Sequence, residues 1–304
     1  MAALLARAFD SDLWWSFRRS PVTVASAVVA LVCILGATFA PLLAPHDPFD
    51  LASLNLGDAF KPPAWSGEGE ALYPLGTDDQ GRDVLSAIMY GARISLLVGV
   101  SSVLFATLLG VALGLLAGYL GGTLDSLLMR IADIQLTFPP ILIALLVDGV
   151  VRASLPPEVH DRIALLVVIV AIGISNWPQY ARTVRGSTLV ERNKEYVLAA
   201  RVIGISQVRI MLTHVLPNVV GPVLVIATLG LSNAIITEAT LSFLGVGVPP
   251  TEPSLGTLIR VGNDFLFSGE WWITIFPGIA LIAMVLSVNL LGDWLRDALN
   301  PRLR

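Results

Sequence analysis

Few residue patterns in this chain could do covalent chemistry. A phosphate-binding loop needs Gly-Lys-Ser/Thr after a glycine-rich turn, but the two lysines, Lys61 and Lys194, follow Phe60 and Asn193. Neither an HExxH zinc motif nor a GxSxG nucleophile motif is present. The sequence therefore predicts that the chain is not an enzyme, and that any nucleotide and its Mg²⁺ are bound by another chain.

The remaining candidates for acid–base or metal chemistry are scattered. His46, His160 and His214 fall on different sides of the topology expected below, so they cannot form one ligand set and no metal site is predicted. Asp148 and Glu238 lie near the ends of apolar runs. An ionisable residue inside a membrane often marks a functional site, but at the rim it is solvated or makes a local hydrogen bond. We prefer this second interpretation for both.

One segment, residues 195–218, has a pattern suited to a mechanical role. It reads EYVLAARVIGISQVRIMLTHVLPN. One stripe of a predicted helix carries Glu195, Leu198, Ala199 and Val202. Ala199 and Ala200 are small, which would let a partner surface approach closely. The alternative is an ordinary amphipathic loop at the membrane interface.

The second half of this segment completes a helix-turn-helix. Gly204 can adopt a positive φ and break the helix into two pieces set at an angle. A second amphipathic piece follows, and Pro217 stands where the next membrane helix is expected to begin, a position that tolerates a missing N–H. The sequence predicts a short helix-turn-helix within residues 186–217, stiffly joined to a spanning helix.

Composition places the chain in a membrane. Of its 304 residues, 55% are hydrophobic and 14% are charged, whereas soluble domains carry about 25% charged residues. The net charge of −4, without a basic patch, excludes a nucleic-acid partner. The single cysteine, Cys33, lies in an apolar run and excludes a disulfide framework. Membrane lipid is therefore the expected surrounding.

Six segments are long and apolar enough, or nearly so, to cross a bilayer, which needs about 20 residues. They are residues 22–44, 94–122, 134–147, 163–181, 215–237 and 271–292. Their continuous apolar character favours helices over a barrel. The third is short and must extend past Asp133, Asp148 or both. The second carries a stripe of small residues, which could pack within this chain or against a partner subunit: Ala106, Gly110, Gly114 and Gly118.

The distribution of positive charge gives an orientation. With the N-terminus inside, 13 of the 19 lysines and arginines lie on the cytoplasmic side, as the positive-inside rule requires. This places both termini and residues 182–214, including Arg192, in the cytoplasm. The 45–92 loop with Ser66 and the 246–270 loop with Thr251 face outside.

Residues 195–218 resemble the EAA loop of ABC importer permeases, whose pattern is Glu-Ala-Ala, three residues, Gly, nine residues, Ile, one residue, Leu-Pro. The matching residues are Ala199, Ala200, Gly204, Leu216 and Pro217. Leu198 occupies the glutamate position and His214 the isoleucine position. Glu195, one turn earlier, is a candidate substitute for the missing acid.

Three further stretches resemble the dipeptide/oligopeptide permease family. They are LGTDDQGRDVLSAIMYGARISLLVG (75–99), LSFLGVGVPPTEPSLGTLI (241–259) and the C-terminal FPGIALIAMVLSVNLLGDWLRDALNPRLR (276–304). With the EAA region they cover more than half the chain in the right order. They resemble the "C" type of the two permeases in such systems, which has a long first outer loop.

The resemblance implies an all-α, six-span type I permease in the bacterial cytoplasmic (inner) membrane. Residues 1–92 would hold the first span and outer loop, and residues 93–304 the permease core. The implied partners are a second permease, two ATPases that bind ATP and Mg²⁺, and an extracytoplasmic binding protein that delivers short peptides. The implied ATPase-docking residues are Glu195, Ala199, Ala200, Arg201, Gly204, Ile205, Ser206, Leu216 and Pro217.

The resemblance also marks an outer-loop signature, Gly76, Thr77, Asp78, Gly81, Arg82 and Asp83. From the residues alone, Asp83 caps a helix beginning at Val84. The signature is then either a surface under the docked binding protein or a salt-bridged entry to a helix, and the sequence leaves both open.

Rival functions are distinguished by what the sequence lacks. A nickel chelate, glutathione or an opine-like compound could replace peptides as cargo, because the binding protein does most of the selection. A membrane enzyme would need a catalytic pair. An ion channel or a secondary transporter would need an intramembrane charged relay or inverted repeats. None of these is visible in the sequence.

Overall fold

The computed structural model describes residues 12–50, 54–248 and 253–298. Both termini and Thr251, whose sides of the membrane were predicted above, lie outside these ranges. Within them the secondary structure is helical, and an isolated antiparallel bridge between Thr77 and Asp83 is the single β interaction. The prediction of an all-α protein is confirmed.

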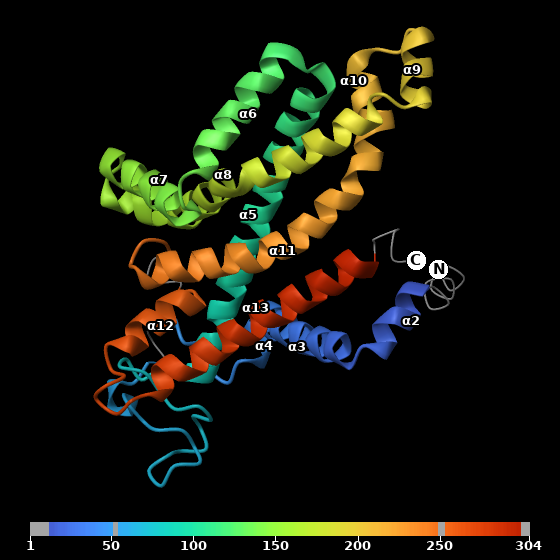
Figure 1. Ribbon diagram of the computed structural model, residues 1–304. Coiled ribbons are helices and arrows are strands. Elements are labelled where there is room, and N and C mark those ends of the chain that lie inside the picture. The colour runs from blue at the N-terminus through green and yellow to red at the C-terminus, as the bar shows by residue number, and fades with distance from the viewer. Residues whose placement is uncertain (1–11, 51–53, 249–252, 299–304) are drawn as a thin grey trace.

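Five helices in the described ranges are long and apolar enough to span a membrane. They are α3 (Pro21–Thr38), α5 (Val84–Leu120), α8 (Pro157–Glu191), α11 (Leu216–Phe243) and α13 (Trp272–Ala298) (Figure 1). A sixth span exists if α6 (Gly122–Leu136) and α7 (Pro140–Ser154) cross together. The shorter elements are α2 (Asp12–Arg19), α4 (Ala40–Leu43), η1 (Leu56–Asp58), α9 (Glu195–Val202), α10 (Gln207–Ile210), the π-helical turn η2 (Met211–Val215) and α12 (Leu255–Asn263).

The third predicted span, residues 134–147, is not one straight helix. It begins inside α6 and crosses the break before α7, where the two helices meet at 95°. The cause is the Pro139-Pro140 pair. Proline has no N–H to donate, and it disfavours the α conformation in the residue before it. Pro139 accordingly has an extended ψ of 132°.

The stripe of small residues on α5 packs within this chain, against α8. A Cβ on Gly110 would lie 2.8 Å from the Trp177 carbonyl oxygen, and one on Gly118 would lie 2.7 Å from Thr188 Cβ. Backbone contact of this kind is what small residues allow in membrane helices. Of the two alternatives left open by the sequence, packing within the chain is confirmed.

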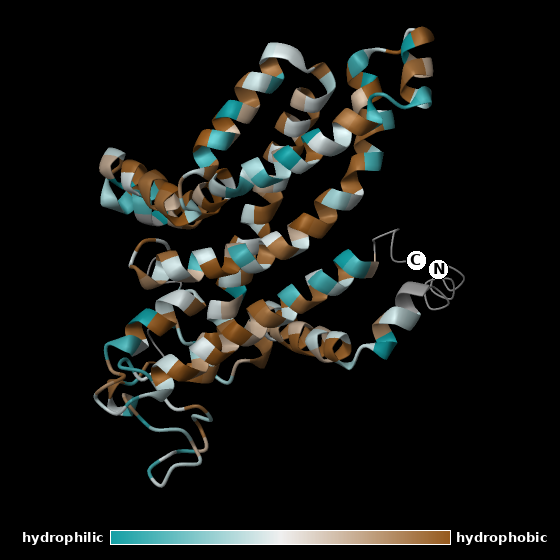
Figure 2. Ribbon diagram, in the orientation of Figure 1, coloured by the Kyte–Doolittle hydropathy of each residue, from teal (hydrophilic) through white to brown (hydrophobic). Residues whose placement is uncertain are grey.

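Much of the apolar surface stays exposed on the spanning helices. Leu31 and Val32 of α3, and Ile279, Ile282 and Leu286 of α13, are all more than half exposed. Figure 2 shows the hydrophobic residues continuing along the length of these helices. A single chain cannot cover this surface, so lipid or partner subunits must do so.

The ends of the molecule carry different elements. In Figure 1, α9 and α10 lie at one end and the outer loop before α5 lies at the opposite end. At the outer-loop end, α5 begins with the predicted cap: Asp83 Oδ2 accepts hydrogen bonds from the Ser86 backbone N–H at 2.8 Å and the Ser86 hydroxyl at 2.5 Å. Helices α2 and α13, the first and last that the structure describes, pack together. The rings of Phe17 and Trp294 meet edge-on there, with their centres 5.3 Å apart.

Candidate functional site

The predicted helix-turn-helix is present, and Gly204 forms its turn. Helix α9 ends at Val202, and Gly204 has a φ of +86°. The Ile205 N–H donates to the Ala200 carbonyl at 3.1 Å and the Gly204 N–H donates to the Arg201 carbonyl at 3.0 Å. This pair of bonds is a Schellman motif, which favours glycine at its left-handed position. Because α10 begins at Gln207, the chain reverses direction within a few residues.

One face of the helix-turn-helix is buried against the ends of α5, α8 and α11. Its buried side chains are Val197, Ala200, Ile210 and Met211, with the partly buried Ile205 and Leu216 beside them. They pack against Leu115, Tyr119, Val184, Val215 and Val219. The two alanines of the motif therefore have different surroundings, because one is buried and the other is exposed. Ala200, at 5% exposure, packs in this chain's own core. Ala199 is exposed.

The opposite face of the helix-turn-helix is exposed and apolar. Val202 is 88% exposed and Ile203 is 77% exposed. The other exposed apolar residues of this face, which we call the docking face, are Leu198, Val208 and Leu212. Glu195, Ser206 and Pro217 are also exposed. Exposed apolar side chains grouped this way are typical of a surface that another protein covers.

The helix-turn-helix leads directly into a membrane helix. Helix α11 begins at Leu216 with Pro217 in its first turn, as the sequence predicted. Helices α10, η2 and α11 nevertheless follow one another without a break, so the helical stretch is continuous from Gln207 to Phe243. The residues just before α11, Met211–Val215, form a π-helical turn. Such a turn widens the helix, which accommodates a proline ring that would otherwise meet the carbonyl one turn earlier.

Two arginines tie the helix-turn-helix to α5. Arg192, just after α8, donates from Nη1 to the Gly118 carbonyl at 2.8 Å. Arg201 of α9 places its guanidinium carbon 4.9 Å from the centre of the Tyr119 ring, and its Nε donates to the Tyr119 hydroxyl at 3.3 Å. Arg201, which is exposed and stays a predicted docking residue, thus also braces α9 against α5.

Tyr196 joins α9 to both neighbouring spans. Its hydroxyl donates to Glu191 at the end of α8 at 2.5 Å and accepts from Asn218 Nδ2 in α11 at 3.0 Å. Burial and the bond to Glu191 raise the pKa of Tyr196 to about 12, so the phenol stays protonated and keeps donating at neutral pH. Sequence reasoning missed Arg192, Tyr196 and Asn218, because their partners are set by tertiary structure and no local pattern marks them.

The outer-loop signature forms a closed, buried turn. Asp78 is 4% exposed and Arg82 is 8% exposed, and Asp78 Oδ2 lies 2.6 Å from Arg82 Nε. Asp78 Oδ1 also accepts from the backbone N–H groups of Gln80 and Arg82 at 2.9 Å. Gly76 and Gly81 both have positive φ. This geometry supports the helix-entry interpretation, because Asp78 and Arg82 pair with each other within the turn itself.

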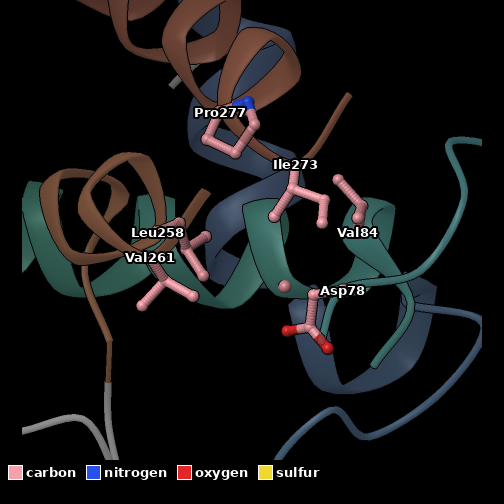
Figure 3. Close-up of a pocket in the computed structure, with 7 residues that line it drawn as sticks. Asp78, Val84, Leu258, Val261, Ile273 and Pro277 are labelled. Atoms are coloured by element: carbon pink, nitrogen blue, oxygen red, sulfur yellow. The ribbon is translucent and has the colours of Figure 1, made fainter. Parts of the chain in front are cut away.

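The same turn fastens the outer loop to α13. Trp272 Nε1 donates to the Thr77 carbonyl at 2.9 Å, and a Cβ on Gly76 would lie 2.9 Å from that indole nitrogen. Figure 3 shows a small pocket at this junction, where α5, α12, α13 and Asp78 meet. It is lined mainly by apolar side chains: Val84, Ala87, Leu258, Val261, Ile273 and Pro277.

The two acids near span ends are buried and not solvated. Asp148 is 2% exposed and lies 3.3 Å from His160 Nε2 and 3.6 Å from Arg152 Nε. Glu238 has no exposed surface and accepts hydrogen bonds from Ser95 and Ser242, each at 2.8 Å. Neither acid is solvated at the rim: Asp148 pairs with nearby residues, and Glu238 is hydrogen-bonded both within α11 and across to α5. The described residues contain no group of three or more potential metal ligands.

Comparisons with known proteins agree with this architecture. Residues 11–63 match the N-terminal transmembrane domain of oligopeptide transport permease C. The dipeptide transport system permease protein DppC of Escherichia coli (strain K12) is 42% identical, over 96% of this chain and 93% of the relative. The di/tripeptide transport system permease protein DppC of Pseudomonas aeruginosa (strain UCBPP-PA14) is 38% identical, over 96% and 92%.

A solved structure shares the fold. The inward-facing MetNI methionine ABC transporter includes a chain that superposes with a TM-score of 0.54 and 20% identity, over 70% of this chain and 96% of that one. Residues 110–304, which are more than half of the chain, match the binding-protein-dependent transport system inner membrane component. The chain therefore belongs to the family of binding-protein-dependent transport system inner membrane components.

Proposed function

We propose that this chain forms half of the pathway of an ABC importer for short peptides and receives the force of ATP hydrolysis through its docking face. The observation that carries the coupling role is an exposed apolar surface on a braced helix-turn-helix that continues without interruption into a spanning helix. A push on this surface reaches the membrane span directly, because the joint between them is helical.

The proposed assembly follows from what the chain lacks and what it exposes. It has no phosphate-binding loop, so two partner ATPases would bind ATP and Mg²⁺ and dock on α9 and α10. A second permease would cover part of the exposed apolar surface and complete the pathway. A binding protein would deliver peptides at the end that carries the outer loop. The cargo is inferred from the relatives, which are named as di- and tripeptide permeases.

Cargo is tested by deleting this chain and measuring solute uptake by the host cell. Deletion of this chain should abolish uptake of a labelled dipeptide or tripeptide by the host cell, and added binding protein alone should not restore it. Re-expression of the chain should restore uptake to the wild-type rate. Normal peptide uptake in the deletion strain, combined with loss of a nickel chelate, glutathione or opine-like solute, would transfer the proposal to that cargo.

Orientation is tested with single cysteines in a Cys33→Ala background. Glu68 in the outer loop and Asn193 between α8 and α9 are both exposed. Asn193 is a better site than Arg192, whose side chain braces α5. An impermeant thiol reagent added to intact spheroplasts should label Glu68→Cys and spare Asn193→Cys until the membrane is opened. The reverse labelling pattern would overturn the proposed cytoplasmic position of the docking face.

A further inference from the structure

Glu238 is a buried carboxyl group that the proposed coupling mechanism does not use. It lies on α11, one turn before the helix ends at Phe243, and none of its surface is exposed. Its Oε2 accepts a hydrogen bond from Ser95 of α5, and its Oε1 accepts one from Ser242 on its own helix. Both oxygens are thus satisfied by hydroxyl groups. A buried carboxyl without such donors would be costly.

Ser95 extends this arrangement to a third helix. Its hydroxyl oxygen, besides donating to Glu238, accepts a hydrogen bond from the backbone N–H of Leu255 at 3.3 Å. Leu255 is the first residue of α12, which Ser254 caps through a bond from the Thr257 N–H. The chain of bonds from Glu238 through Ser95 to Leu255 therefore joins α11, α5 and α12.

Backbone packing holds the first turn of α12 in the same place. A Cβ on Gly91 of α5 would lie 3.3 Å from the Leu255 nitrogen. A Cβ on Gly256 of α12 would lie 2.6 Å from Ala239 Cα, next to Glu238. With no side chains between them, the three helices are in direct contact. Figure 1 shows α12 beside α11 and α13, towards the end that carries the outer loop.

We propose that Glu238 is a positioning residue that makes α12 move together with α5 and α11, so that the outer end of the pathway opens and closes as one unit. This inference rests on the proposed function for the meaning of opening and closing. Glu238 accepts the Ser95 hydroxyl proton and so holds the Ser95 oxygen towards the Leu255 N–H. Separation of α12 from α5 would leave this buried N–H without its acceptor, which is costly, and would open the backbone contacts at Gly91 and Gly256.

The experiment uses the full assembly of this chain, the second permease and both ATPases in lipid nanodiscs. Glu238→Leu and Ser95→Ala should each raise amide hydrogen exchange of α12 by about tenfold, as expected for the loss of one buried hydrogen bond. Stimulation of ATPase activity by peptide-loaded binding protein should fall towards the unstimulated rate in both variants. Glu238→Gln should restore both readouts, because its amide oxygen still accepts from Ser95 and its amide N–H donates to Ser242.

Ser232→Ala is the matched control. Ser232 is buried on the same helix, and its hydroxyl has no hydrogen-bond partner in the structure, so neither readout should change. Unchanged α12 exchange in Ser95→Ala, or full ATPase stimulation despite a loosened α12, would overturn the proposal. Failure of the proposed function gives a different result: the wild-type assembly would not respond to peptide-loaded binding protein, while the exchange comparison would still test Glu238.

Discussion

Replacement of Gly204 by valine should abolish transport while leaving the amount of this chain in the membrane unchanged. Gly204 has a φ of +86°, and a Cβ there would meet no neighbouring atom within 4 Å. The penalty is therefore one of backbone conformation, about 1–2 kcal/mol for an L residue in the left-handed region and larger for a β-branched side chain. The chain can relieve it by leaving the Schellman turn, which tilts the docking face.

Gly204→Asn is the matched control, because asparagine also occurs at this position of the motif. It should retain most of the transport activity, whereas the valine variant should bind the ATPases weakly or hydrolyse ATP without moving substrate. Leu198→Glu, which restores the acid of the EAA pattern at a half-exposed position, should be tolerated. The measurements are pull-down of the ATPases and peptide uptake by vesicles. Wild-type uptake by a normally assembled Gly204→Val transporter would refute the coupling role of this turn.

Replacement of Gly114 by leucine should greatly reduce the amount of folded chain. A Cβ at Gly114 would overlap the Ala181 carbonyl oxygen and lie 2.9 Å from Val184 Cβ, so α5 and α8 would have to separate. Overpacking usually costs about 1–3 kcal/mol, and a leucine set against backbone lies at or beyond the upper end. We expect the folded yield after detergent extraction to fall by about tenfold or more.

Gly149→Leu provides the control for this prediction. Gly149 is exposed on α7, and a Cβ there would contact no atom within 4 Å of it. The same substitution should leave the yield of the isolated chain near wild type, as measured by fluorescence-detected size exclusion. Equal yields for Gly114→Leu and Gly149→Leu would mean that the contact between α5 and α8 is looser than the structure indicates.

The sequence predicted best those features that depend on neighbouring residues. The Asp83 cap and the left-handed Gly204 follow from local chemistry, and the structure has both. The break between α6 and α7 was also marked in the sequence, by Pro139-Pro140, but the apolar run around it concealed the signal. The local sequence was therefore sufficient to predict turns and helix caps. It was misleading between α6 and α7, where the apolar run continues across the break.

Features that depend on distant residues could not be predicted. The sequence marked Ala199 and Ala200 alike as small residues, but which of them faces the core depends on Tyr119 and Val184 in other helices. Glu238 resembled a solvated rim residue, because its partner Ser95 lies 143 positions earlier in the chain. Which face of a helix is buried depends on the elements that pack against it, and these cannot be identified from the sequence of the helix alone.

The uninterrupted helix from Gln207 to Phe243 can act as a lever whose two arms differ in length. Tyr180 of α8 meets Gly230 on this helix, where a Cβ would overlap the tyrosine hydroxyl, and this crossing is a natural fulcrum. At 1.5 Å per residue, the arm from Gln207 to Gly230 is about 35 Å and the arm from Gly230 to Glu238 is about 12 Å. If the helix turns rigidly about this crossing, a displacement at Gln207 reaches Glu238 reduced about threefold, and the force there is raised by the same factor. A small displacement with a large force is what the separation of tightly packed helices requires.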